Sequence, residues 1–223
     1  MDFGAALTYF FRDPRWARKF LLAGLISLIP VFGHLVVLGW AMHVARGVIE
    51  QLEQPVAELD LAEDFLRGLK IWGLNLIYAL PGLVIGFPLS LGAGVMLASA
   101  GDQSRFAAFA LFFLCLSIVL VFYGVFLALL LPAAYGNLLA HGEQFSAGLD
   151  VKEVLGLIRH GPVAYFLVLI GGMMSAFITL FGLAGCLIGV VFSGTFAQIV
   201  MAYLIGQAYR EAAGLALHAY ENG

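Results

Sequence analysis

The side chains that could do chemistry in the apolar stretches of this chain are neutral and widely spaced. They include His34, Asn75, Gln198 and Gln207. A pair of histidines could ligate a haem or a chlorophyll, but a neutral imidazole needs only one hydrogen-bond partner, so we favour an interhelical hydrogen bond for His34. We expect the three amides to join helices in the same way. We therefore assign no cofactor-binding residue and predict no cofactor.

Charged catalytic groups are missing from these stretches. No Asp, Glu, Lys or Arg lies deep inside one, whereas such residues mark proton relays and ion-coupling sites in membranes. The sequence also has no His-Glu-x-x-His zinc motif, no P-loop and no convincing Gly-x-Ser-x-Gly nucleophile. Cys115 and Cys186 lack metal-ligand spacing, and we interpret both as small buried hydrophobes. We predict no catalytic residue, no metal site and no enzymatic activity.

Small residues recur at helical spacing near the C-terminus, where Gly185, Gly189, Ser193 and Ala197 form a ridge. Such a ridge lets a second helix approach closely. We favour packing within one chain over dimerisation, although short matches carry little weight in a chain with 27 glycines.

Long apolar segments must position these residues, and the central one covers residues 106–131 without a charged side chain. At 1.5 Å per residue it reaches roughly 39 Å, more than the ~30 Å hydrocarbon core of a bilayer. Hydrophobic residues make up 62% of the 223 residues and charged residues 11%, against about 45–50% and 25% in soluble domains. The sequence therefore predicts an all-α, polytopic helical membrane protein with a single domain, residues 1–223. The other full spans are expected at 72–98, 163–179 and 189–209.

Residues 20–44 are interrupted by Pro30 and allow two interpretations. One is a fifth span that kinks at Pro30. The other is a re-entrant hairpin with half-length arms at 20–29 and 34–44. In the hairpin arrangement ten of the 11 Lys and Arg residues fall on one side, and cytoplasmic loops collect such residues. We therefore favour the hairpin, with both termini cytoplasmic in a multi-pass protein of the cell membrane.

Two short amphipathic interfacial helices are expected outside the spans. Asp60 with Glu63, and Asp150 with Glu153, make the same Asp-x-x-Glu start, in which a side-chain oxygen caps free N–H groups. The apolar face of the first helix consists of Leu61, Phe65, Leu66 and Leu69. That of the second consists of Val151, Val154, Leu155 and Ile158. The recurrence indicates a weak internal duplication of residues 20–98 and 106–182, followed by a closing helix at 186–210.

Several short motifs, spread over almost the whole chain, resemble an uncharacterised prokaryotic membrane family known as domain of unknown function 4013. They are Asp13-Pro14 with Trp16, Ile29-Pro30 with Gly33 and Gly39, Phe65 with Gly68-Leu69-Lys70, Tyr78 with Pro81, and Gly189, Phe196, Tyr203, Gly206-Gln207 and Tyr209-Arg210. The resemblance implies a multi-pass membrane protein without an established activity. Where the family often has Pro-x-Trp-Asp, this chain has Pro55, Glu58, Leu59 and Asp60, which leaves the docking of this linker open.

Two functions remain open from the sequence. The first is a non-enzymatic scaffold, accessory subunit or lipid-interacting component, and the second is a channel or facilitator for a neutral or lipid-like substrate. Broken, glycine-rich segments line binding sites in transporters and favour the second. The expected partners are membrane lipids and other membrane subunits or a second copy of the chain. With a net charge of −3, nothing indicates nucleic acid.

Overall fold

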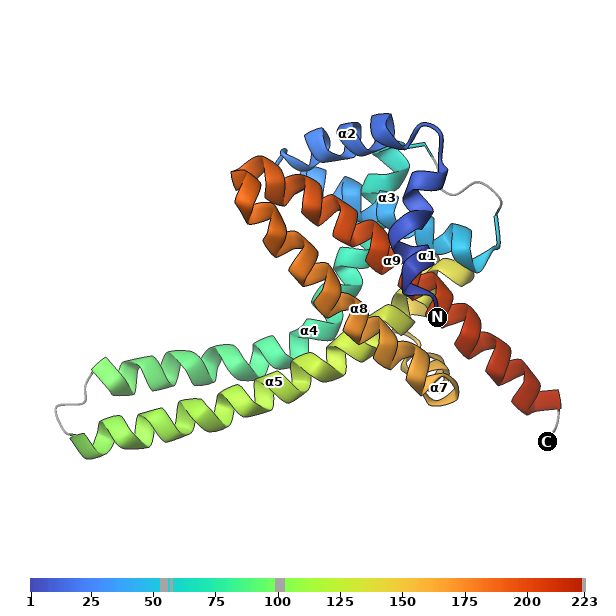
Figure 1. Ribbon diagram of the computed structural model, residues 1–223. Helices are drawn as coiled ribbons and strands as arrows, with labels where there is room; N and C mark the ends of the chain where they lie inside the picture. Colours follow the sequence, from blue (N-terminus) through green and yellow to red (C-terminus); the bar gives the residue numbers. More distant parts are fainter. Residues whose placement is uncertain (53–55, 57, 99–102, 222–223) are drawn as a thin grey trace. The chain divides into compact units, whose positions relative to one another are not determined.

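Helices account for the regular structure of the protein in a computed structural model (Figure 1). The structure describes residues 1–52, 56, 58–98 and 103–221, and within these it contains no strand. Five stretches of this part are long and apolar enough to cross a membrane: Phe32–Ile49, Leu61–Val95, Phe109–Ala140, Pro162–Gly185 and Ile188–Ala216. The predicted all-α, polytopic helical fold is confirmed.

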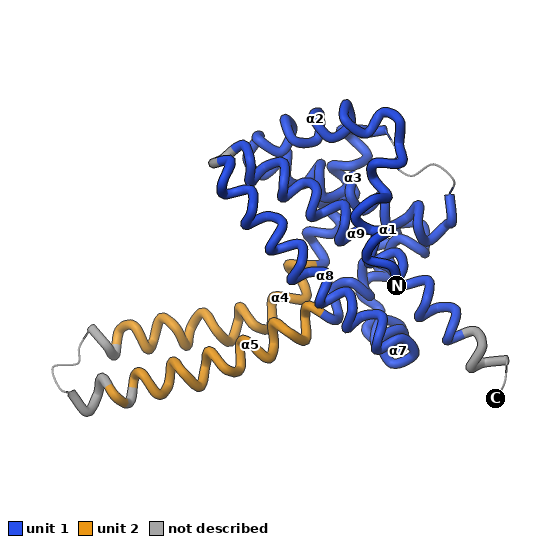
Figure 2. The backbone as a smooth tube through the Cα atoms, in the orientation of Figure 1, with its two compact units in different colours: residues 1–74, 129–223 blue, residues 75–128 orange. Residues whose placement is uncertain are grey.

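The chain divides into two compact units, coloured separately in Figure 2. Unit 1 comprises residues 1–74 and 129–223, and unit 2 comprises residues 75–128. The division falls within two long helices, α4 (Leu61–Ala98) and α5 (Gln103–Ala140). These boundaries do not coincide with the predicted repeats at 20–98 and 106–182, and the duplication stays a prediction.

The N-terminal part of unit 1 contains a helical hairpin. It consists of α1 (Phe3–Thr8), the 3-10 helix η1 (Tyr9–Arg12), α2 (Trp16–Ser27) and α3 (Phe32–Ile49). The chain reverses between α2 and α3, where Val31 adopts a positive φ of 64°. A side chain at Gly33 would overlap the Ile26 carbonyl oxygen, so only glycine lets α3 start this close to α2.

The kinked single helix proposed for residues 20–44 is therefore wrong. The expected arms at 20–29 and 34–44 also differ from the structure, because α3 has 18 residues and α2 has 12. At 1.5 Å per residue α3 is about 27 Å long, close to the thickness of the hydrocarbon core. The hairpin thus pairs one short helix with one helix of nearly full membrane length.

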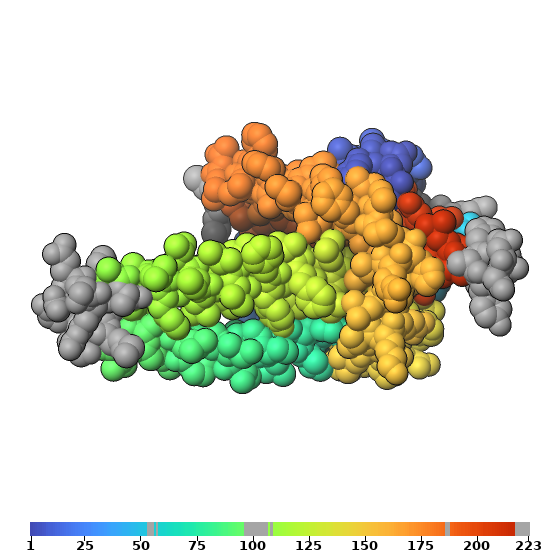
Figure 3. Space-filling view, turned by 90° about the horizontal axis from the view of Figure 1, so that it is seen from below, coloured from blue at the N-terminus to red at the C-terminus, as the bar shows by residue number. Residues whose placement is uncertain are grey.

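Unit 2 is a pair of antiparallel helical segments from α4 and α5, which lie side by side in the space-filling view of Figure 3. The Tyr123 hydroxyl on α5 donates a hydrogen bond to the Tyr78 carbonyl on α4 at 2.5 Å, and Gly82 lies against the Tyr123 ring. Most large side chains point outward, including Phe87 and Phe122. Cys115 is also exposed, so its interpretation as a buried hydrophobe is wrong.

The C-terminal part of unit 1 is built around α9. It contains α6 (Phe145–Leu149), α7 (Val151–His160), α8 (Pro162–Phe181), the 3-10 helix η2 (Gly182–Gly185) and α9 (Cys186–Glu221). Helix α9 packs along both α8 and α3. Trp40, Tyr165 and Leu204 are among the largest fully buried side chains of this core.

Three predicted helix boundaries differ from the structure. The central helix does not end near Pro132 but continues as α5 to Ala140, and the closing helix continues past residue 210 to Glu221. The short helix expected after Asp60 is the first part of α4 rather than a separate element. Prolines and linker residues end fewer helices than predicted, because neighbouring helices can supply partners for the backbone groups that a proline frees. The sequence also predicts a short turn at 101–105; residues 103–105 already belong to α5, and residues 101 and 102 lie outside the described residues.

Both predicted N-caps are present. The Asp150 side chain accepts hydrogen bonds from the backbone N–H groups of Lys152 and Glu153, at 3.1 and 3.2 Å. Asp60 does the same for Ala62 and Glu63. The Asp60 N–H itself donates to the Asp64 carboxylate at 2.9 Å.

Candidate functional site

A cluster of charged side chains lies inside unit 1, where α4 begins. Its centre is Arg67, which donates from Nη1 to Oδ1 of Asp64 and from Nε to Oε1 of Glu143, both at 2.6 Å. The same Nη1 lies 3.2 Å from Nδ1 of His43. Asp64 is 0% exposed and Arg67 3%. We call these four residues the ionic cluster.

A close crossing of α3 and α4 creates this cluster. A side chain at Gly39 would overlap the carbonyl oxygen of Asp64, and one at Gly68 would overlap that of Leu35. The two helix backbones can therefore touch only because both positions are glycine. The crossing places the first turns of α4 beside His43, one helical turn after Gly39.

Two further cations surround the cluster on its more exposed side. Lys70 Nζ donates to the Glu143 backbone carbonyl at 3.1 Å, and Arg46 Nη1 lies 3.5 Å from Glu143 Oε1. Burial alone would raise the pKa of Glu143. The hydrogen bond from Arg67 and the charges of Arg67, Lys70 and Arg46 outweigh burial and hold that pKa below its ordinary value.

The cluster was missed because the prediction for residues 61–69 considered only their apolar face. That face is largely exposed, with Leu61 at 50%, Leu66 at 56% and Leu69 at 42%. The buried face of this part of α4 carries Asp64 and Arg67. In a bilayer, apolar side chains can face lipid while polar groups gather inside the protein, so an apolar stripe does not identify the buried face. Asp64 and Arg67 lie in the first two turns of the candidate span Leu61–Val95 and not deep inside it.

The hydrogen bonds of the ionic cluster hold its charged side chains in place. Each carboxylate accepts at least one hydrogen bond from Arg67, and such charge-assisted bonds hold both partners in place. A carboxylate whose pKa lies below its ordinary value, like Glu143, is a poor general base near neutral pH. This geometry therefore favours a structural role, in which the ionic cluster joins α3, α4 and the loop after α5.

A second ion pair docks the linker that precedes α4. Lys19 Nζ, on α2, donates to Asp13 Oδ2 and to the Val56 carbonyl, both at 2.5 Å. Arg15 also pairs with Glu58 at 2.7 Å. The linker is thus held by a buried lysine and not by the aromatic side chain that the family's motif would supply.

An open cavity of about 530 Å³, whose mainly apolar wall carries several polar groups, is lined by residues of α2, α3, α8 and α9. Two predicted residues line it, His34 from α3 and Gln198 from α9. Gln198 Oε1 is buried and has no hydrogen-bond partner among the described residues, whereas His34 is exposed. The hydroxyl side chains of the lining are Ser27, Ser175, Thr179 and Thr195. We call this space the polar cavity.

The predicted small-residue ridge is divided by the structure. A side chain at Gly189 would overlap the Gly182 carbonyl, and Ser193 donates to the Thr179 carbonyl at 3.2 Å. These two residues therefore pack the start of α9 against the end of α8. Gly185 lies in η2 with open space beside it, outside the contact.

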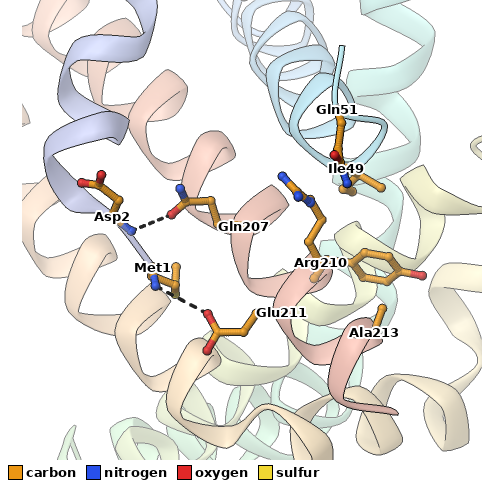
Figure 4. A pocket seen from close by; sticks show the side chains of 10 residues that line it. Met1, Asp2, Ile49, Gln51, Gln207, Arg210, Glu211 and Ala213 are labelled. Carbon is orange, nitrogen blue, oxygen red and sulfur yellow. Dashed lines mark hydrogen bonds and ion pairs between the residues drawn. The ribbon is translucent and has the colours of Figure 1, made fainter. Parts of the chain in front are cut away.

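The two remaining predicted amides lie elsewhere. Gln207 borders a pocket of about 710 Å³ near the N-terminus, where its Oε1 accepts a hydrogen bond from the Asp2 backbone at 3.0 Å (Figure 4). Asn75 is half-buried on α4, in unit 2. Of the four predicted polar side chains, the structure therefore brings together His34 and Gln198.

Among the residues that the structure describes, no three His, Cys, Asp or Glu side chains come together as a metal-ligand group.

Comparisons with known proteins agree with the motifs. No curated protein and no solved structure matches the chain. The family described as "Protein of unknown function (DUF4013)" matches residues 22–190. The chain therefore belongs to the DUF4013 family of membrane proteins.

Proposed function

We propose that this protein is a non-enzymatic, lipid-contacting scaffold or accessory subunit of the cell membrane. The observation that carries the proposal is the ionic cluster, in which the buried charges are joined to one another. Catalysis in a low-dielectric site depends on positioned acids, bases or oxyanion donors that can engage a substrate. Asp64 and Glu143 are instead held by Arg67, which suits a rigid framework.

The exposed apolar surface supports contact with lipid and with other membrane subunits. In unit 2, Val84, Phe87, Val121 and Phe122 are each more than 60% exposed. Soluble proteins rarely expose large contiguous apolar patches, whereas helices that are apolar on all faces are typical of membrane spans. Helix α7, whose polar and apolar residues alternate with helical period, would lie in the interface.

We further propose that both termini and the linker before α4 are cytoplasmic. Met1, Asp2, Ile49 and Arg210 border one pocket, so these parts of unit 1 lie at one end. Ser27, Thr179 and Val190 border the polar cavity, so the α2–α3 and α8–α9 turns lie near one another. This arrangement supports the hairpin topology, in which ten of 11 cations share one side and the positive-inside rule assigns that side to the cytoplasm.

Purification under mild conditions, followed by reconstitution, tests the proposed function. We expect a stoichiometric membrane protein to accompany the chain from its native membrane, and the purified chain to show no hydrolase, transferase or redox turnover. Liposomes containing the chain should show no specific flux of small neutral solutes or labelled lipids. Saturable flux that disappears in Gln198→Leu, but not in the exposed-site control Gly124→Leu, would overturn the scaffold.

The polar cavity favours a second candidate, a facilitator for a neutral or lipid-like substrate. Its lining combines the unpartnered Gln198 Oε1 with small residues such as Gly172 and Gly194, as in transporters that bind their substrate between helices. The flux experiment separates this function from the scaffold.

A further inference from the structure

We infer that the polar cavity is a binding site for a neutral lipid whose polar end carries a free hydroxyl group. The inference specifies the lipid-contacting part of the proposed function and names the ligand class. The cavity, at about 530 Å³, falls within the range of ~300–1,000 Å³ that is usual for small-molecule sites.

The hydroxyl groups of the cavity wall all donate hydrogen bonds to backbone carbonyls. Ser27 donates to the Gly24 carbonyl at 2.7 Å, and Thr179 donates to the Ser175 carbonyl at 3.0 Å. Ser175 and Thr195 likewise donate to backbone carbonyls. A hydroxyl oxygen that donates its proton keeps lone pairs that can accept. The wall therefore offers mainly acceptors, and a complementary ligand must be a donor.

Gln198 strengthens this requirement. Its Oε1 is a buried acceptor without a partner, and leaving such a group unpaired costs free energy. His34 is exposed and adds to the lining an imidazole whose ring nitrogens can donate or accept. A ligand hydroxyl can supply the donor that Gln198 Oε1 lacks.

The absence of charge in the lining decides between neutral and ionic ligands. Its members are polar but uncharged, or apolar, such as Val190, Val191 and Met201. A phosphate or ammonium group would have to leave water without a counter-charge, which is costly in a low-dielectric site. A neutral polar end avoids this cost.

Access from the bilayer points to a lipid and not to a water-soluble polyol. Met173 and Phe177, on α8, follow lining residues directly in sequence and are 58% and 61% exposed. On α2, Ser27 is followed by the exposed Leu28. The helices that form the wall thus present apolar side chains beside the lining, where alkyl chains of a bound lipid can lie.

Photolabelling in nanodiscs tests this site. The probe is a diacylglycerol with a diazirine and an alkyne on one acyl chain, and its matched comparators are the same molecule with its hydroxyl methylated and the corresponding phosphatidic acid. We expect saturable labelling of residues 172–201 by the free-hydroxyl probe. Methylation, or the variant Gln198→Leu, should weaken half-saturation about two- to tenfold, as expected for one hydrogen bond.

A cavity-filling variant supplies the second arm. A Cβ at Gly194 would meet only the Thr179 methyl group, at 3.9 Å, so Gly194→Leu should extend into the cavity and reduce labelling. Gly124→Leu, on exposed helix surface with nothing within 4 Å, is the matched control and should label like the wild type. If Gly194→Leu fails to fold, Gln198→Leu and the methylated probe still decide the question.

Equal labelling by the methylated probe or by phosphatidic acid would overturn the inference, as would displacement by free glycerol. Unchanged labelling in a folded Gly194→Leu variant would overturn it as well. If labelling fails while a membrane partner still accompanies the chain, the lipid site is wrong and the scaffold function stands. If labelling holds and saturable flux is found, the scaffold is wrong and the lipid site stands.

Discussion

Arg67 donates from Nε to Glu143 Oε1 at 2.6 Å, although the two residues are 76 positions apart in the sequence. The pair joins the first part of α4 to the loop that follows α5. Both residues belong to unit 1, so this contact joins the segment of unit 1 that precedes unit 2 in the sequence to the segment that follows it. The ionic cluster therefore holds the two segments of unit 1 together.

Removal of Arg67 should destabilise unit 1 strongly. Arg67→Met leaves the fully buried Asp64 carboxylate without its cation, and breaking a buried pair in this way costs about 3–5 kcal/mol. The change is measured by unfolding in detergent. Arg46→Met is the control, because Arg46 is about one-third exposed and such pairs contribute only about 0–1 kcal/mol.

A double variant separates the ion pair from simple packing. If the cost arises from the uncompensated charge, Arg67→Met combined with Asp64→Leu should be more stable than Arg67→Met alone. Additive losses in the double variant would instead assign the cost to lost packing.

Acid should weaken the ionic cluster. The folded pKa of Glu143 lies below its ordinary value of 4.5, so its contribution is complete above about pH 4.5 and is lost as the pH falls through the folded pKa. Asp13 has a lowered pKa too and adds a loss in the same direction. Melting temperatures between pH 3 and 7 measure this dependence.

The variant Glu143→Gln isolates the contribution of Glu143. It should melt lower than the wild type at pH 7 and should lose less stability on acidification. A wild-type and a Glu143→Gln curve that stay parallel across the whole range would show that Glu143 does not carry the acid sensitivity.

The helical spans could be predicted from the sequence because a long uncharged run has few alternatives to a span. The interruption at Pro30 was also visible locally, but the hairpin was favoured over a kink only by the distribution of cations, since α4 continues through Pro81 and Pro88. Asp60 and Asp150 were identifiable as caps from local signals, since capping involves residues only two or three positions apart.

The ionic cluster and the polar cavity required the three-dimensional structure. The hydrophobic pattern of residues 61–69 locates an apolar stripe but does not say whether that stripe faces protein or lipid. Glu143 was visible only as a linker residue, because nothing local indicates its pairing with Arg67. His34 and Gln198 were candidates separately, yet 164 positions separate them and only the packing of α3 near α9 brings them to one cavity.

The cap of α7 should be replaceable by asparagine but not by alanine. Asp150→Ala removes the acceptor for the Lys152 and Glu153 N–H groups and should cost about 0.5–2 kcal/mol of local stability. Hydrogen exchange over residues 151–158 should accelerate. Asp150→Asn keeps a side-chain oxygen and should exchange like the wild type, whereas equal exchange in all three proteins would show that the cap is unimportant.

Single-cysteine labelling should locate the termini. In a background with both native cysteines replaced by serine, an impermeant reagent outside intact cells should miss cysteines at positions 2, 52 and 146 and reach one at position 102. Leu52 is 56% exposed and is a better reporter of the linker than Val56, which is 2% exposed and would be unreactive on either side. External labelling of position 2 would contradict the hairpin topology.

The crossing of α3 and α4 should depend on glycine at position 39. In Gly39→Ala the added methyl group overlaps the Asp64 carbonyl oxygen, so α4 must move away from α3, and overpacking of this kind typically costs about 1–3 kcal/mol. Because Asp64 and Arg67 move with that backbone, the variant should also lose part of the acid sensitivity that the ionic cluster confers. Gly156→Ala, in α7, is the matched control: nothing lies within 4 Å of its added methyl group, and alanine is the better helix former by about 1 kcal/mol. Detergent melting curves of both variants at pH 7 and pH 4 measure the two effects together, and a Gly39→Ala protein as stable as Gly156→Ala would show that the close crossing does not hold the cluster in place.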